Sequence, residues 1–420
     1  MIQIIDLTET DAPLFDPKSW NLTSFQAELC EKARRLGKEN FAPRAETWDR
    51  EASFPVDNYE DLKKEGMLGI CIPDSEGGMG ADFKSYMLAA SEIGRYCGTT
   101  ALTFNMHVCS CLWTGNLADS LGLDEPTLEQ LHQGRSLHYQ RILDEGAVYS
   151  QPFSEGNAAA AGKMPFGTLA TKTEKGWIIN GKKVFASLSG NADYYGILAT
   201  EDKPRLSRRD TLYIAVPSTH QGVEVIGDWD PLGMRGTVSR TLLLNNVEVP
   251  DEAQLMPRGL YHEAAMRWPH MFMTLCPTYV GIARAAYSFT CSYLRGKVEE
   301  GPPAGESLKS PIKQISLAQM RIKLEQTTAL FERAITEAKY RPSKAERLRA
   351  YATHYTVMES ANDLCRDAVR ICGGRAIFKN LRLEQLYRDS RCGSLMLPWT
   401  PDICLERLGK ESLNSPIDIP

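Results

Sequence analysis

The sequence predicts an α+β protein in which a β domain separates two helical domains. Residues 149–250 consist of short alternating or β-branched segments, such as 192–200 and 241–249, which are typical of strands. The flanking segments have helical periodicity, and in residues 311–341 the side chains of Met320, Leu324 and Phe331 fall on one face. We therefore expect a helical domain over residues 1–146, a β-barrel or sandwich over 147–256, and a C-terminal domain resembling a four-helix bundle over 257–420.

The composition limits the classes of function. The chain has 420 residues and a formal net charge of −5, which argues against a nucleic acid or an anionic membrane as the main partner. No apolar run approaches the roughly 20 residues that span a bilayer. The acidic first residues have neither a signal-peptide nor a transit-peptide pattern, which predicts a cytoplasmic protein. Cys109 and Cys111 form the closest cysteine pair and lack a second pair at metal-ligand spacing, so no metal site is expected.

The N-terminal third contains apolar positions at helical spacing. Helices are predicted over residues 24–41, 58–67, 83–96, 99–117 and 127–145. Residues 73–80 contain three glycines and are predicted to form a loop.

Helices resume after the β segment. Residues 277–294 are apolar enough for a central bundle helix, with Pro277 tolerated in its first turn. The two prolines and two glycines of residues 299–310 predict a loop. Helices are then expected over 311–341, 343–371 and 401–409. Residues 372–400 are predicted to be irregular and partly functional.

Four segments occur in an informative order and spacing. They are 72–80 (IPDSEGGMG), 149–156 (YSQPFSEG), 183–193 (KVFASLSGNAD), and 232–239 (LGMRGTVS) together with 247–250 (VEVP). In this order they resemble the acyl-CoA dehydrogenase family over nearly the whole chain. The resemblance implies the acyl-CoA dehydrogenase fold, FAD as cofactor, and α,β-dehydrogenation of an acyl thioester carried by CoA or by a carrier protein.

The second and third segments resemble the flavin-binding loops of the family. A flavin needs hydrogen-bonding groups along its polar edge and an apolar wall against one ring face. The resemblance places Tyr149 and Ser150 in this site, with Ser150 at the pyrimidine edge, Ser187 near N5 and Phe185 as an aromatic wall. Taken alone, each serine also suits a turn or helix cap, and Phe185 suits a sheet core.

No Gly-x-Gly-x-x-Gly pattern follows a strand, so a Rossmann-type site is not expected. Residues 370–375 (RICGGR) stand where the family has glutamine-x-x-glycine-glycine. This implies that Gly373 and Gly374 approach the FAD pyrophosphate, with Arg370 in place of the glutamine and Thr400 also at the cofactor. The two glycines are equally consistent with a helix C-cap. In the family, part of the FAD site comes from a neighbouring subunit, which implies a homodimer or homotetramer.

The family's catalytic carboxylate is missing. Its usual position falls on Leu397 or Pro398, and its alternative position falls on Met271, none of which accepts a proton. The remaining candidates are weak: His270, Asp402 and Glu263. His270 also suits a structural hydrogen bond, and Asp402 suits the first turn of the last helix.

Further residues resemble the family's substrate site, and the function remains open between three alternatives. The resemblance places Asn105, Ser154, Asn157 and Trp399 near the substrate. Without a positioned base, the chain is either a dehydrogenase of a specialised thioester, a flavin-dependent monooxygenase, hydroxylase or oxidase on the same scaffold, or a weakly catalytic flavin-binding subunit. An electron-transfer flavoprotein or a flavin reductase is the expected redox partner.

Overall fold

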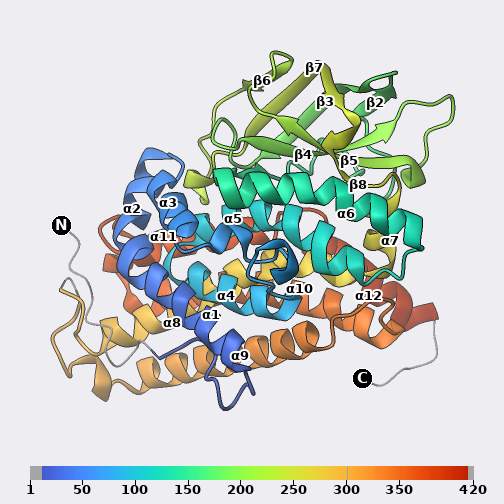
Figure 1. Ribbon diagram of the computed structural model, residues 1–420. Helices are drawn as coiled ribbons and strands as arrows, with labels where there is room; N and C mark the ends of the chain where they lie inside the picture. Colours follow the sequence, from blue (N-terminus) through green and yellow to red (C-terminus); the bar gives the residue numbers. More distant parts are fainter. Residues whose placement is uncertain (1–11, 300, 415–420) are drawn as a thin grey trace.

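The computed structural model describes residues 12–299 and 301–414, and its elements follow the predicted order of helices, strands and helices (Figure 1). Side-chain caps begin several of the first helices: Thr23 accepts a hydrogen bond from the Gln26 N–H, and Asp82 and Asp124 cap later helices in the same way. The N-terminal helices are α1 (Ser24–Leu36), α2 (Ala42–Glu51), α3 (Val56–Lys64), α4 (Phe83–Tyr96), α5 (Gly98–Leu112) and α6 (Glu125–Gln140).

The β domain is one eight-stranded sheet with the order β6-β7-β3-β2-β4-β5-β8, and β1 pairs with β4. Strands β4 and β5 are buried along nearly their whole length, which matches their continuous apolar sequences. Helix α6 lies along the sheet and contacts β8 (Figure 1). The strands are β1 (Tyr149–Ser150), β2 (Leu169–Lys172), β3 (Gly176–Ala186), β4 (Tyr194–Glu201), β5 (Thr211–Pro217), β6 (Val223–Ile226), β7 (Arg240–Pro250) and β8 (Gln254–Met256).

The C-terminal helices differ most from the predicted set between residues 372 and 400. Residues 382–393 form a regular helix, whereas residues 372–400 were expected to be irregular. This helix is mostly polar, and its apolar core positions are limited to Leu383 and Leu386, too few to give a clear helical period. The helices are α7 (Leu260–Arg267), α8 (Cys276–Leu294), α9 (Pro311–Thr336), α10 (Lys344–Cys372), α11 (Arg382–Gly393) and α12 (Pro401–Asn414).

Helices α4 and α8 join the two helical domains through a close crossing. A Cβ atom added at Gly281 of α8 would lie 2.3 Å from the backbone nitrogen of Arg95, and one added at Gly94 of α4 would lie 2.8 Å from the carbonyl oxygen of Thr278. Only glycine leaves room for the two backbones to approach this closely. The two helical domains therefore share one core.

Arg388 and Asp389 of α11 connect all three domains. The guanidinium of Arg388 donates to both carboxylate oxygens of Asp49 in α2, at 2.6 and 2.9 Å, and to the carbonyl oxygen of Leu232 in the β domain, at 3.1 Å. The Asp389 carboxylate accepts a hydrogen bond from the Met234 N–H at 2.6 Å. Burial raises the pKa of Asp389 to about 7. These two adjacent residues fix the β-domain segment 232–234 against the helices.

Replacing Gly281 with alanine tests the close crossing of α4 and α8. The added methyl group meets backbone atoms that cannot move aside, so we expect Gly281→Ala to lower the free energy of unfolding by about 3 kcal/mol. Gly409 is the matched control, because it lies on α12 with open space around it. Gly409→Ala should raise stability by about 0.5–1 kcal/mol. Urea denaturation measures both, and equal effects would contradict the proposed role of the crossing.

Candidate active site

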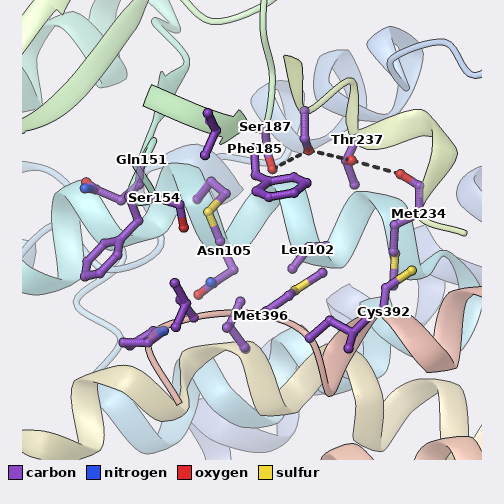
Figure 2. A pocket seen from close by; sticks show the side chains of 18 of the residues that line it. Leu102, Asn105, Gln151, Ser154, Phe185, Ser187, Met234, Thr237, Cys392 and Met396 are labelled. Atoms are coloured by element: carbon purple, nitrogen blue, oxygen red, sulfur yellow. Dashed lines mark hydrogen bonds between the residues drawn. The ribbon is translucent and has the colours of Figure 1, made fainter. Parts of the chain in front are cut away.

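A cavity of about 400 Å³ lies where the β domain meets the helical domains (Figure 2). Its walls come from α5, the loop after β1, the end of β3, residues 229–239, residues 271–275 before α8, and residues 391–398 at the end of α11 and after it. Most of the lining is apolar, as in small-molecule sites. The lining residues used below are Leu102, Asn105, Cys109, Trp113, Gln151, Phe153, Ser154, Phe185, Ser187, Trp229, Met234, Thr237, Ser239, Met271, Phe272, Arg391, Cys392, Leu397 and Pro398.

The turn at the end of β3 places Phe185 and Ser187 at the cavity. Phe185 has a φ of 54°, and its side chain is 68% exposed, which is unusual for a phenylalanine. The backbone N–H groups of Leu188 and Ser189 donate to the carbonyl oxygens of Thr237 and Val238, at 2.9 and 3.1 Å. The turn is thus fixed against the segment before β7, and Phe185 stays at the cavity wall.

A chain of hydrogen-bonded hydroxyl groups determines whether the Ser187 hydroxyl donates or accepts at the cavity (Figure 2). Thr237 Oγ1 donates to the Met234 carbonyl oxygen at 2.8 Å, and this uses its one hydroxyl proton. The 2.7 Å bond between Ser239 and Thr237 must therefore be donated by Ser239, and the 2.8 Å bond between Ser187 and Ser239 must be donated by Ser187. Ser187 consequently presents lone pairs, not a proton, to the cavity.

Ser154, rather than Ser150, reaches the cavity. Ser150 is 1% exposed in β1, where its hydroxyl donates to the Ser187 carbonyl oxygen at 2.5 Å. Tyr149 is fully buried beside it and stacks on Tyr194 with 5.0 Å between the ring centroids. Pairing of β1 with β4 holds both residues inside the sheet, so neither predicted flavin contact lines the cavity.

A buried ion pair fixes the loop that carries Ser154. Lys183 of β3 is fully buried, and its Nζ donates to Glu155 Oε1 at 2.8 Å and to the Leu198 carbonyl oxygen at 2.6 Å. Burial lowers the pKa of Lys183 to about 8, against the opposing effect of Glu155. Glu155 also accepts from the N–H groups of Gly167 and Thr168. This pair was not predicted from the sequence; a lysine directly before the apolar residues 184–186 of a predicted strand was the available signal.

Both family positions for a catalytic carboxylate face the cavity, and both are apolar. Leu397 and Pro398 line it from the segment after α11, and Met271 lines it from the segment before α8. Among the described lining residues there is no aspartate, glutamate or histidine. Burial raises the pKa of the Cys109 and Cys392 thiols to about 12, so both are protonated at neutral pH.

The three weak base candidates do not line the cavity. His270 is fully buried against Trp268, neither ring nitrogen has a partner among the described residues, and burial lowers its pKa to about 4. Asp402 is exposed in the first turn of α12. Glu263 forms an ion pair with Arg267 one helical turn away. His270 is next to the lining residue Met271 in sequence, yet its side chain does not line the cavity.

Of the predicted substrate and phosphate residues, only Asn105 and Ser154 line the cavity. Trp399 is 1% exposed and packs on Tyr351, with ring centroids 4.5 Å apart. Asn157 is exposed and accepts from the Ala159 N–H, and Thr400 accepts weakly from the Ile403 N–H at 3.4 Å in the first turn of α12. The remaining residues, Arg370, Gly373 and Gly374, lie on the exposed turn that ends α10, where Gly373 has a φ of 83°.

The residues present fit a flavin. The aromatic surface of Phe185, with Trp229 at 6.3 Å in an edge-on arrangement, suits one face of a planar ring. The Trp229 Nε1–H is buried and has no partner among the described residues, and Ser187 offers lone pairs. An apolar wall bordered by a few hydrogen-bonding groups is what a flavin ring requires.

Comparison with known proteins identifies the family to which this fold and cavity belong. Residues 23–117, 154–247 and 267–397 match the N-terminal, middle and C-terminal domain models of acyl-CoA dehydrogenase. The chain belongs to the acyl-CoA dehydrogenase family. It is 26% identical to the probable acyl-CoA dehydrogenase YngJ of Bacillus subtilis over 89% of its own length and 94% of that protein.

Solved structures confirm the predicted fold class of this family member. Butyryl-CoA dehydrogenase of Megasphaera elsdenii superposes with a TM-score of 0.75 at 22% identity, over 94% of this chain and 99% of that one. The FMN-bound dibenzothiophene monooxygenase of Paenibacillus sp. A11-2 superposes with a TM-score of 0.78 at 21% identity, over 92% and 97% of the two chains. As a member of this family, the protein is an acyl-CoA dehydrogenase-like oxidoreductase, and the family supports a flavin cofactor.

The described part of the chain, residues 12–299 and 301–414, contains no group of three or more histidine, cysteine, aspartate or glutamate side chains that would hold a metal ion. It also contains no helix of sufficient length and apolar character to traverse a bilayer.

Removing His270 separates its structural role from a catalytic one. Its pKa is about 4 in the folded protein and 6.5 for the unperturbed group, so between these pH values the unfolded chain binds the additional proton and unfolding becomes easier as the pH falls. As the pH falls from 6 to 4.5, the free energy of unfolding of His270→Leu should therefore rise, relative to that of the parent protein, by about 1.4 kcal/mol for each pH unit. Urea unfolding at several pH values measures this. A large loss of flavin reduction by substrate in a stably folded variant would instead restore His270 as a base.

Proposed function

We propose that this protein is an FAD-dependent oxidoreductase that removes hydrogen from the α and β carbons of an acyl thioester. The observation that carries the proposal is the cavity itself: the wall formed by Phe185, Ser187 and Ser154 faces the segment 395–398, where the family places its catalytic carboxylate. The curated relatives named acyl-CoA dehydrogenases support a thioester carried by CoA or by a carrier protein.

The chain's own residues have separate roles in this proposal. When bound, the flavin supplies a two-electron acceptor for hydride. Phe185 would support one face of its ring, Ser187 would lie near N5, and Ser154 would take the place at the ring edge predicted for Ser150. Gly373 and Gly374 approach the FAD pyrophosphate of a neighbouring subunit, which makes the protein a homodimer or homotetramer. An electron-transfer flavoprotein or a flavin reductase is the redox partner.

Proton removal distinguishes this protein from its dehydrogenase relatives. The cavity lining holds no carboxylate or histidine among the described residues, and a positioned general base contributes roughly 10²–10⁴ to the rate. The same observation favours a second candidate, oxygen-dependent hydroxylation, which needs no base at the α carbon. The monooxygenase with the same fold is consistent with this second candidate.

Anaerobic titration of the FAD-loaded protein with short-chain, long-chain and aryl acyl-CoA thioesters separates the two candidates. Loss of the oxidised-flavin absorbance supports dehydrogenation. If no thioester removes it, while the chemically reduced protein consumes oxygen and a hydroxylated product forms, the second candidate is correct. Failure to retain any flavin would exclude both.

A carboxylate placed at position 397 should increase dehydrogenation. Leu397 is one of the two residues on which the family's usual base position falls, and it is only partly buried, so a polar side chain can be accommodated there. We expect Leu397→Glu to accelerate flavin reduction by an acyl-CoA at least about 10²-fold. Leu397→Gln is the control, because it has the same shape but cannot accept the proton at neutral pH. Stopped-flow measurement of flavin reduction gives both rates, and equal rates would mean that proton removal does not limit the reaction.

Because the Ser187 hydroxyl can only accept a hydrogen bond at the cavity, reversing this role should change the midpoint potential of the flavin. A group that only accepts hydrogen bonds favours the reduced ring, in which N5 carries a proton, over the oxidised ring. Ser239→Ala frees the Ser187 proton for donation, so we expect the midpoint potential to fall by about 20 mV, equivalent to about 1 kcal/mol for two electrons. Ser189→Ala is the control, because the Ser189 hydroxyl donates to the Ala186 carbonyl oxygen and takes no part in the hydrogen bonds that join Ser187, Ser239 and Thr237. A rise, or an equal shift in both variants, would contradict the assigned direction.

A further inference from the structure

A basic surface lies outside the cavity, on a chain whose formal net charge is −5. Arg205, Arg208 and Arg209 belong to the loop between β4 and β5, and all three residues are exposed. Among the described residues, none of the three forms an ion pair with a carboxylate. The loop therefore produces a local positive potential on an acidic protein.

The acidic residues at this loop are bound to other groups. Glu201 and Asp210 both pair with Lys203, at 3.0 and 3.1 Å. Asp202 accepts a hydrogen bond from the Thr171 hydroxyl at 3.2 Å. The arginines of the loop are thus left without a counter-ion in the described part of the chain.

The arginine loop is held between α7 and the loop before β2. The Arg208 guanidinium donates to the Gly162 carbonyl oxygen. A Cβ atom added at Gly259, directly before α7, would lie 2.8 Å from the Arg209 carbonyl oxygen. Burial, followed by the charges of Arg208 and Arg209, lowers the pKa of His262 on α7 below its usual value. Three segments that are distant in sequence therefore form one surface.

Exposed apolar side chains accompany the arginines. Leu206 of the same loop is 42% exposed, and Met164, two residues after Gly162, is 44% exposed. Met266 follows His262 by one turn of α7 and is 60% exposed. Arginine and methionine are enriched at protein–protein interfaces, from which lysine and glutamate are depleted. The arginine surface is defined here by six residues: Met164, Arg205, Leu206, Arg208, Arg209 and Met266.

The arginine surface adjoins the cavity wall. Phe153 lines the cavity, and its ring centroid lies 6.4 Å from that of Tyr261 on α7 and 6.0 Å from that of Phe166. Tyr261 directly precedes His262, and Phe166 follows Met164 by two residues. A partner docked on this surface therefore lies next to the cavity.

We propose that the arginine surface docks an acidic carrier protein, which presents the thioester on a phosphopantetheine arm in place of CoA. The inference rests on the proposed function for the thioester. Carboxylates of the carrier protein would pair with the three arginines, whose planar guanidinium groups suit interface ion pairs. Aliphatic side chains of the same partner would cover Met164, Leu206 and Met266. The nucleotide of free CoA offers phosphates to the arginines but no aliphatic surface to these neighbours.

The test compares one acyl group on two carriers. Flavin-loaded protein is titrated calorimetrically, at about 0.1 M salt, with hexanoyl-CoA and with the hexanoylated acyl-carrier protein of a bacterial type II fatty acid synthase. We expect the carrier protein to bind at least about 10-fold more tightly than hexanoyl-CoA. Arg205→Glu and Arg209→Glu should each weaken its binding about 10-fold, because like charges then meet across the interface. Neither variant should change the binding of hexanoyl-CoA.

Lys175→Glu is the matched control, because Lys175 is an exposed cation at the turn between β2 and β3, outside the arginine surface. An equal loss of carrier-protein binding in this variant would mean that only the total charge matters, and it overturns the docking. Binding of hexanoyl-CoA as tight as that of the carrier protein also overturns it. The same holds if Arg205→Glu and Arg209→Glu weaken both ligands equally, because the arginines would then hold the phosphate that the two ligands share.

The unmodified carrier protein separates docking from chemistry, since it has neither the arm nor the acyl group. It should bind the parent protein more tightly than Arg209→Glu. If both forms of the carrier protein bind in this way while no hexanoyl thioester reduces the flavin, the docking is supported and the dehydrogenation is refuted. Flavin reduction by hexanoyl-CoA without any binding of the carrier protein supports the proposed function and overturns the docking.

Discussion

The Arg388–Asp389 pair is the connection on which the arrangement of this molecule depends. A guanidinium bonded to Asp49 and to the Leu232 carbonyl, next to a carboxylate bonded to the Met234 N–H, links three domains within two residues. Met234 also receives the hydroxyl of Thr237, so the same segment determines the polarity of Ser187. The position of the helices and the hydrogen-bonding character of the cavity are therefore coupled through residues 232–239.

Much of the fold follows from local sequence. The β-branched strands and the long helical periods each extend over many residues, so one atypical residue does not obscure them. They predict the order of the domains. Helix α11 was missed because two apolar core positions amid charges give little periodicity. Its place in the protein comes from long-range bonds of Arg388 and Asp389, which a local pattern does not contain.

The candidate site was predicted only in part, for a similar reason. Ser187, Phe185, Asn105 and Ser154 line the cavity, as do both family positions of the missing carboxylate, all of which motif spacing had indicated. Ser150 and Ser154 have similar surroundings in sequence, and the pairing of β1 with β4 decides which of them reaches the cavity. The orientation of the Gln151 amide depends on Tyr213, 62 residues away, so it was not accessible to motif reasoning.

The crossing of α4 and α8 has a consequence for synthesis on the ribosome. Helix α4 ends at Tyr96 and α8 begins at Cys276, 180 residues later. At 5–20 residues per second, the face of α4 that receives α8 remains uncovered for about 10–40 s after it is made. During this interval the nascent N-terminal helices expose an apolar surface to solvent. They are predicted to be clients of ribosome-associated chaperones until the last third of the chain emerges.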